Sequence, residues 1–389
     1  MSWLHEVRIK DICDLITVKT NIKNASIENY ISTENMLPNF GGVEYAEKIP
    51  ASNTVNTFIP QDVLFSNIRT YFKKVWFSRF NGTASADVLV FRAKDNCDSK
   101  FLYYLMCDPS FIEYTVLTSK GAKMPRGDKD AIFSYPVLLP SLKEQKTMTS
   151  MLSSLDDKID LLHRQNKTLE SMAETLFRQW FIEEAQDEWI YEELGSVIDT
   201  SSGGTPSRKE MSFYQNGIYN WVKSKELNGS LLTKTEEMIT DEAIKKSSAK
   251  LLPAYSTLIA MYGATVGEYA LTTKEMACNQ AVCALKYNKK YPYTFIFMYI
   301  KTKKNELINQ AIGSAQQNIS QIIIKKMLIP TCHDLIAEYH TQVEAYFDSI
   351  KLNIEKIQTL ENLRDILLPK LMSGEVRVQY AEEAIASVA

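Results

Sequence analysis

The chain has 389 residues, of which 45% are hydrophobic and 23% are charged, and its formal net charge is −3. A chain of this length exceeds one ordinary core, so we expect two or more domains. No apolar run reaches the roughly 18–20 residues that a membrane span needs, and the first residues lack the pattern of a secretory signal. We therefore expect no membrane segment and a cytoplasmic location.

The acidic residues are concentrated near the carboxyl end. Residues 1–140 have a net charge of +1 and residues 184–330 of +2, whereas residues 141–183 have −1 and residues 331–389 have −5. Two near-neutral segments can still present basic faces, and the acidic end is better suited to a protein partner than to phosphate. The six scattered cysteines and four histidines lack the close pairs of a zinc site, so we expect reduced, structural cysteines and no bound metal.

The first 140 residues contain strand-like segments at residues 62–66 and 86–90 and end in an apolar run at residues 135–139. This mixture predicts an α/β domain over residues 1–140. A long helix is predicted next, over residues 141–183. Ser141 and Glu144 have the spacing of a capping box, in which each side chain bonds the other residue's backbone amide.

Apolar residues recur along this helix at steps of three and four, which is typical of a coiled-coil seam. The series is Met148, Leu152, Leu155, Ile159, Leu162, Leu169, Ala173, Leu176 and Trp180, with Asn166 in one polar position. We favour the same seam for Phe181, although Trp180 and Phe181 are also candidates for contact with a partner protein.

The pattern then repeats with a period near 190. Strand-like segments at residues 257–261, 280–285 and 326–329 predict a second α/β domain over residues 184–330, and Thr331 and Asp334 repeat the capping box. A second helix is predicted over residues 331–375, followed by a tail at 376–389. Its apolar series is Ile336, Tyr339, Val343, Tyr346, Ile350, Ile357, Leu360, Leu367 and Leu371, with Asn353 and Arg364 in polar positions.

These elements predict an α+β chain with two α/β domains in a pseudo-twofold arrangement, separated by two long helices that pair as an antiparallel coiled coil. The alternative is two amphipathic helices that pack separately, each on its own domain. A 33-residue apolar series would make a rod of roughly 50 Å, longer than a small domain needs, which favours pairing. Asn166 and Asn353 would then fix the register, or else lie at its edge.

No catalytic motif is found. The sequence lacks the phosphate-binding loop of nucleotide hydrolases, the glycine-rich dinucleotide turn and the signature of amino-group DNA methyltransferases. Residues 263–267 are interpreted as a turn between strands. Asp130 with Glu144, Gln145 and Lys146 only loosely imitates a nuclease metal site, since Glu144 already serves the capping box.

Several motifs resemble those of the specificity subunits of Type I restriction–modification systems. They are residues 203–207 (GGTPS), 213–222, 260–267 and 279–281 (NQA), and the two helix ends at residues 176–181 and 367–375. The resemblance covers essentially the whole chain, but the first domain lacks the GGTP and NQA segments. It implies two target recognition domains, each reading one half of a split double-stranded DNA target.

The resemblance also implies partners and cofactors. The chain would join two methyltransferase subunits, and further restriction or translocase subunits, while binding no cofactor itself. S-adenosylmethionine, ATP and Mg²⁺ would belong to the partner subunits.

Candidate DNA contacts are cationic, amide and aromatic side chains on loops, because bases and phosphates are read by such groups. In the first domain they are Arg69, Tyr71, Lys73, Lys74, Lys120, Lys123, Arg126 and Lys129. In the second they are Lys223, Lys225, Tyr262, Thr265, Gln316, Gln317 and Asn318. Any single lysine among them could instead be a solvated side chain without a partner.

Two other functions stay open from the sequence. The chain could be a coiled-coil scaffold that never binds DNA, or a stand-alone nuclease or methyltransferase.

Overall fold

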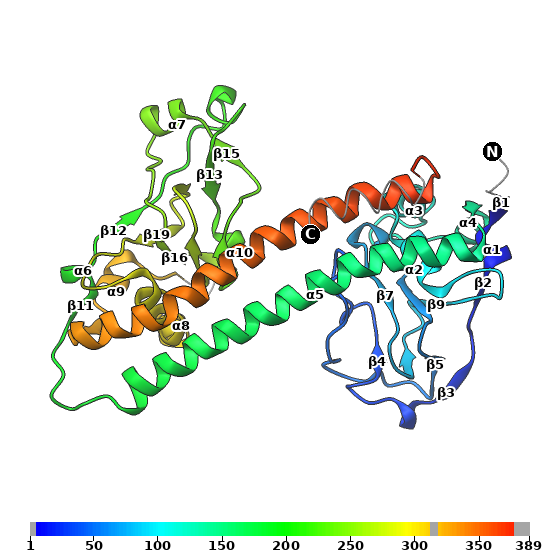
Figure 1. Cartoon of the computed structure of the whole chain (residues 1–389), viewed down its shortest axis with the longest axis horizontal. Coiled ribbons are helices and arrows are strands. Elements are labelled where there is room, and N and C mark those ends of the chain that lie inside the picture. Colours follow the sequence, from blue (N-terminus) through cyan, green and yellow to red (C-terminus); the bar gives the residue numbers. More distant parts are fainter. Residues whose placement is uncertain (1–4, 312–317, 377–389) are drawn as a thin grey trace. The chain divides into compact units, whose positions relative to one another are not determined.

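The computed structural model describes residues 5–311 and 318–376. It contains two compact units: unit 1 consists of residues 1–159 and 359–389, and unit 2 of residues 160–358. Each unit therefore combines a globular part with a segment of both long helices, α5 (Leu142–Arg178) and α10 (His333–Met372) (Figure 1).

The described part of unit 1 is built on two four-stranded sheets. The central sheet has the order β2 (Cys13–Leu15), β9 (Val88–Ala93), β6 (Val63–Ser66) and β7 (Val75–Phe77). The second has the order β3 (Lys19–Asn21), β5 (Thr54–Phe58), β8 (Gly82–Ala84) and β4 (Tyr30–Ile31). A separate antiparallel pair joins β1 (His5–Arg8) to β10 (Pro136–Leu139).

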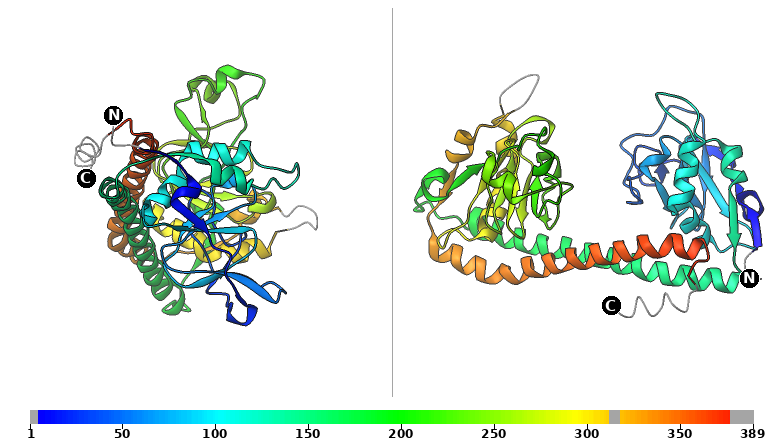
Figure 2. Two further views of the ribbon diagram at one scale, coloured as in Figure 1. Left: turned by 90° about the vertical axis from the view of Figure 1, so that its right-hand side faces the viewer. Right: turned by 90° about the horizontal axis from the view of Figure 1, so that it is seen from above.

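Helices cover one face of the central sheet in unit 1. The short helices are α1 (Ile9–Ile12), α2 (Ser99–Cys107), α3 (Pro109–Leu117) and α4 (Lys129–Ser134). Helix α2 contacts β6, β7 and β9 on one side. On its other side the Tyr104 hydroxyl donates to Asp156 of α5 at 2.6 Å. Unit 1 thus has three layers: sheet, α2 and the long-helix segments (Figure 2).

Unit 2 repeats this plan. Its five-stranded sheet has the order β12 (Thr200–Ser202), β19 (Val282–Leu285), β16 (Thr257–Ala260), β17 (Tyr269–Thr272) and β14 (Leu231–Leu232). A three-stranded sheet has the order β15 (Met238–Ile239), β13 (Tyr219–Val222) and β18 (Met276–Cys278). The pair β11 (Tyr191–Glu193) and β20 (Leu328–Pro330) corresponds to β1 and β10.

Helix α8 (Tyr293–Asn309) takes the place of α2 in unit 2, with α6 (Leu194–Val197), α7 (Asp241–Lys246) and α9 (Gln321–Lys325) around it. It contacts β16 and β17 on one side. On the other, Phe295 packs against Phe177 of α5, and the Lys301 ammonium lies between the carboxylates of Glu170 and Glu174. The same three layers therefore form around a continuous aromatic core.

The two units share the register of their central strands. Leu64 pairs with Val90 across β6 and β9, and Leu258 pairs with Ala284 across β16 and β19, each 194 positions later. The pairs β6–β7 and β16–β17 are related by the same shift. The faint sequence repeat thus corresponds to one fold used twice.

The two long helices begin differently. At α5 the predicted capping box is present: Glu144 accepts from the Ser141 backbone amide at 3.1 Å and Glu144 N donates to the Ser141 hydroxyl at 3.4 Å. At α10 the prediction is wrong. The Thr331 hydroxyl donates to the Ile190 carbonyl at 3.0 Å, and the helix begins at His333. Thr331 instead fastens the segment before β11 to the start of α10.

Segments of α5 and α10 contact each other inside each unit. In unit 1, Arg364 of α10 forms an ion pair with Asp156 of α5 at 3.0 Å. In unit 2, Asn353 donates to Asn166 at 2.9 Å and the Tyr339 hydroxyl donates to the Ala173 carbonyl at 2.9 Å. Residue numbers rise on one helix as they fall on the other, so the contacting segments of unit 2 run antiparallel.

The helix residues predicted to pair are mostly buried. Leu155, Ile159, Leu162, Ile350, Asn353, Ile357 and Leu360 are at most 9% exposed, while Leu169 and Tyr346 are partly buried. Phe177 and Phe347 lie deeper than the predicted Leu176 and Tyr346, because α8 adds a second packing direction in unit 2. The predicted tail at 376–389 lies outside the described residues, apart from Val376.

The Asn166–Asn353 bond gives a test of the helix contact in unit 2. Replacing Asn166 by Leu leaves the buried Asn353 amide without its partner, so we expect the free energy of unfolding to fall by about 1–3 kcal/mol. Replacing both asparagines by Leu should restore or exceed the wild-type value, because two apolar side chains then face each other. Urea unfolding measures both changes, with Lys167→Leu, an exposed neighbour, as the control. Equal losses in the single and double variants would contradict this contact.

Candidate nucleic-acid interface

Two loops that the sequence singles out meet in unit 1. The turn between β6 and β7 and the loop before α4 are joined by the Arg69 amide, which donates to the Pro125 carbonyl at 2.8 Å. Gly127 donates to the Asn67 carbonyl at 3.0 Å, and Ile68 and Arg126 form an isolated β-bridge. These bonds bring the predicted basic cluster around Arg69 next to the predicted cluster around Arg126.

The cations of this surface differ in their availability. Lys120 pairs with Asp128, which lowers the pKa of that carboxyl, and Arg126 pairs with Asp87 at 3.0 Å. Lys74 donates to the Thr33 carbonyl at 2.7 Å, and burial lowers the pKa of its ammonium. Within the described residues, Arg69, Lys73, Lys123 and Lys129 have no ion pair, and Lys123 and Lys129 are exposed. Lys123 and Lys129 are therefore the best placed to meet phosphate, whereas Arg69 is partly buried and Lys73 lines a cavity with Asp156 and Arg364 of the long helices.

Backbone strain is concentrated at the same turn. Arg69 and Lys73 flank a 3₁₀ turn, η2 (Thr70–Phe72), and both have left-handed conformations with φ of 51° and 55°. Asn39 and Phe40, at φ of 54° and 61°, are also left-handed, and their amides donate to the Phe72 and Lys73 carbonyls. A side chain with a Cβ pays about 1–2 kcal/mol for this conformation. Such strain is characteristic of functional sites.

Unit 2 has the same turn with different side chains. Tyr262 and Asn318 form the bridge that corresponds to Ile68 and Arg126, and Ile319 donates to the Met261 carbonyl at 2.8 Å. The left-handed positions are occupied by Gly263, the first residue of η6 (Gly263–Thr265), and by Gly267, two residues after its end; this is the predicted turn.

The remaining candidates of unit 2 fall into three groups. Tyr262 is 47% exposed, and Thr265 is partly exposed, with its hydroxyl donating to the Tyr262 carbonyl at 3.3 Å. Asn318 is exposed at the bridge. Gln316 and Gln317 lie outside the described residues.

Lys223 and Lys225 are already paired with acidic side chains. Lys223 bonds Glu236 at 2.9 Å and Glu237 at 2.8 Å, and Lys225 bonds Glu236 at 2.7 Å. Arg208 and Lys223 together hold the pKa of Glu237 at about 2, so this carboxylate stays ionised at neutral pH. Because the glutamates offset their charge, these two lysines are poorer phosphate ligands than their positions in the sequence indicate.

The GGTPS and NQA motifs, which carry part of the family resemblance, make contacts that hold the fold of unit 2 together. A Cβ on Gly203 would lie 2.1 Å from the Cys278 carbonyl oxygen, so only glycine allows this close approach. The Trp221 indole donates to the Gly204 carbonyl at 3.0 Å, and Thr205 bonds Gln280 of the NQA segment.

Sequence reasoning missed two contributors to these surfaces. Phe72 is 40% exposed beside Tyr71, and the Arg208 guanidinium lies 4.5 Å from the Tyr214 ring centroid and 5.1 Å from that of Trp221. Phe72 could have been found as the apolar member of a run that is otherwise basic and aromatic. The stacking of Arg208 depends on folding and has no local signal.

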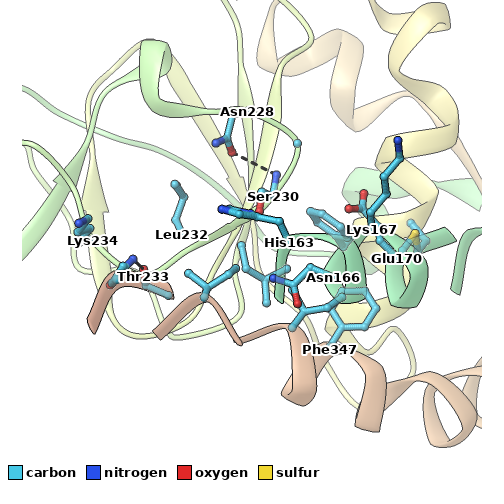
Figure 3. A pocket seen from close by; sticks show the side chains of 17 residues that line it. His163, Asn166, Lys167, Glu170, Asn228, Ser230, Leu232, Thr233, Lys234 and Phe347 are labelled. Atoms are coloured by element: carbon cyan, nitrogen blue, oxygen red, sulfur yellow. Dashed lines mark hydrogen bonds between the residues drawn. The ribbon is translucent and has the colours of Figure 1, made fainter. Parts of the chain in front are cut away.

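A cavity of about 420 Å³ lies in unit 2 between α5, α8, α10 and residues 228–234 (Figure 3). Its apolar lining includes Leu232 and Phe347, and its polar lining includes His163, Asn166 and Lys167. The described residues contain no group of three or more His, Cys, Asp or Glu side chains that could hold a metal ion. No helix among them is long and apolar enough for a membrane crossing.

Comparison with known proteins places the chain in a family. The model of the Type I restriction modification DNA specificity domain matches residues 2–171 and again residues 186–362. A Methanocaldococcus jannaschii protein, the Type I restriction enzyme MjaIX specificity subunit, is 26% identical over 308 residues, which are 74% of this chain and 71% of that protein. The Type I restriction enzyme HindI specificity subunit of Haemophilus influenzae is 20% identical over a match that covers 81% of this chain and 86% of that protein.

A solved structure shows the same fold. The S subunit of a Type I restriction–modification system from M. genitalium superposes with a TM-score of 0.61 at 15% identity, covering 95% of this chain and 96% of that chain. The two matches of the family model coincide with the two halves of the repeat and together span most of the sequence. The chain therefore belongs to the family of Type I restriction–modification DNA specificity subunits.

Proposed function

We propose that this chain reads a split double-stranded DNA target, one part with each unit, on behalf of a Type I restriction–modification enzyme. The observation that carries the proposal is the paired loop bridge: Ile68 with Arg126 in unit 1 and Tyr262 with Asn318 in unit 2. The two bridges occupy equivalent places in the backbone of the two units, but their exposed side chains differ. Such a pair of surfaces is suited to reading two unlike sequences with one fold.

Catalysis belongs to partner subunits in this proposal. Two methyltransferase subunits would bring S-adenosylmethionine, and restriction or translocase subunits would bring ATP and Mg²⁺. The loose nuclease pattern gains no support from the structure, because Glu144 is bonded to Ser141 in the capping box. Catalytic residues are accordingly assigned to none of the side chains described above.

The long helices have a second task in this proposal. We infer that α5 and α10 pair as an antiparallel coiled coil that sets the spacing between the two half-sites and docks the methyltransferase subunits. The Asp156–Arg364 and Asn166–Asn353 contacts support this pairing within each unit. Helices of 37 and 40 residues would each be about 55–60 Å long, more than one DNA turn of about 34–36 Å.

A domain exchange tests the reading function. Replacing residues 184–330 with a different recognition domain should change one half of the methylated motif and leave the other half unchanged. Single-molecule sequencing of methylated sites in cells that carry the exchanged subunit measures this directly. If both halves changed, the two units would not read DNA independently.

A matched pair of lysine variants tests which cations meet phosphate. Lys123→Ala removes an exposed lysine without an ion pair in the described structure, so we expect weaker DNA binding and a salt slope, log K against log salt, reduced by about one. Lys223→Ala removes a lysine that Glu236 and Glu237 already neutralise, so the slope should stay unchanged. The measurement is DNA affinity of the complex at several salt concentrations. A larger effect on the salt slope from Lys223→Ala than from Lys123→Ala would show that this assignment of the phosphate contacts is wrong.

The spacing function is tested by lengthening the helices. Four residues inserted beside Asn166 in α5, with four beside Asn353 in α10, add about 6 Å and a net rotation of about 40°. This rise is close to two base pairs of about 3.4 Å. We expect a methylated motif with both halves intact and a gap altered by one or two base pairs. Full activity with an unchanged gap would show that the helices do not set the spacing.

A further inference from the structure

Two aromatic side chains stand exposed on the strained turn of unit 1. Tyr71 is 48% exposed and Phe72 is 40% exposed, and their ring centroids are 4.7 Å apart. Thr70, the first residue of the same turn, is by contrast buried, at 3% exposed. The rings are therefore turned outward from the core although burial would stabilise them.

The backbone holds this aromatic pair in a fixed place. The Arg69 amide donates to the loop before α4, and the Phe72 and Lys73 carbonyls accept from Asn39 and Phe40. Four of the seven non-glycine residues with positive φ in the described chain lie in these two segments. A turn that is bonded on both sides loses little freedom when a ligand meets it, which favours binding.

The surroundings of the pair are cationic. Arg69 and Lys73 flank the two aromatic residues in the chain, and the Lys74 ammonium lies 5.9 Å from the Phe72 ring centroid. The bridge to Arg126 brings in the loop that carries Lys123. Exposed aromatic rings with cations in the same turn and in the bridged loop match duplex DNA, in which stacked bases lie inside two rows of phosphates.

Unit 2 lacks this feature at the equivalent position. The shift of 194 residues that relates β6 to β16 makes Thr265 and Val266 the equivalents of Tyr71 and Phe72. Val266 is only 6% exposed. The left-handed positions there are glycines, so the turn forms without strain, and it presents no pair of rings: a single ring, Tyr262, is exposed immediately before it, at 47%. The two units therefore offer different chemistry to their half-sites.

We propose that Tyr71 and Phe72 form a wedge that opens and stacks on one base step in the half-site read by unit 1, while unit 2 leaves its half-site stacked. The inference rests on the proposed function, since it requires that unit 1 bind DNA. It assigns to this chain a distortion of one half-site, with specificity drawn from how readily that step unstacks.

The experiment uses the full chain in complex with its methyltransferase subunit, bound to duplexes that carry the methylated motif. The adenine analogue 2-aminopurine, which fluoresces when unstacked, replaces one base at a time in each half-site, leaving out the base that is methylated. Tyr71→Ser with Phe72→Ser removes both rings, and Tyr71→Phe with Phe72→Tyr is the matched control that keeps them. Thermal unfolding confirms that both variants remain folded.

We expect a several-fold rise in fluorescence at one step of the first half-site with the wild-type and control proteins. The serine variant should lose this rise and bind the cognate duplex about tenfold more weakly or worse, since stacking on one base contributes about 1–3 kcal/mol. The fluorescence of 2-aminopurine in the second half-site should stay low with every protein.

Three results would overturn the inference. Wild-type complex that binds the duplex without brightening any step of the first half-site would show that no wedge is inserted. An unchanged affinity and fluorescence in the serine variant would show that the rings do not cause the distortion. Loss of the methyltransferase subunit from the serine variant in gel filtration, with DNA brightening retained, would assign the rings to a protein contact. A wild-type complex that binds no DNA would instead refute the proposed function itself.

Discussion

Leu64 pairs with Val90 in unit 1, and Leu258 pairs with Ala284 in unit 2, through the same antiparallel register. A register shift of one residue would turn every side chain of these strands to the opposite face, so the buried faces hold it firmly. The turn after β6 is bridged to the loop before α4, and the turn after β16 is bridged to the segment before α9. Because both units pair their central strands in the same register, these turns start from equivalent positions, and the candidate interface is built on them.

The two turns differ in how they achieve the same backbone path. Gly263 and Gly267 adopt left-handed conformations freely, whereas Arg69 and Lys73 adopt them at a cost. Unit 1 therefore gives up stability in exchange for two cationic side chains at positions where glycine would suffice. Because the surrounding hydrogen bonds to Pro125, Asn39 and Phe40 hold the turn in place, the strain persists in the folded chain.

Sequence periodicity predicted the long helices and their inward residues, because spacing alone reports which face of a helix is apolar. It also placed Asn166 and Asn353 in polar positions of the two apolar series, and they bond each other. Periodicity could not rank Phe177 above Leu176, since the second packing surface, α8, comes from a distant part of the chain. Loop cations were found by composition, but their partners were not: Glu236 and Glu237 reach Lys223 from 13 and 14 residues away across a fold that the sequence does not display.

The pairing of several loop cations bears on how DNA is held. Lys120, Arg126, Lys223 and Lys225 all face carboxylates, so four of the nine candidate cations already have a carboxylate partner. Non-specific attraction to phosphate rises with each unpaired cation, so the pairing of these four side chains lowers it. A lower non-specific affinity helps a specificity subunit to dissociate quickly from wrong sequences. Discrimination depends on the difference between the specific and the non-specific affinity. The affinity for the correct site must then come from contacts that form only there, and the rigid, strained turn of unit 1 has the geometry to supply them.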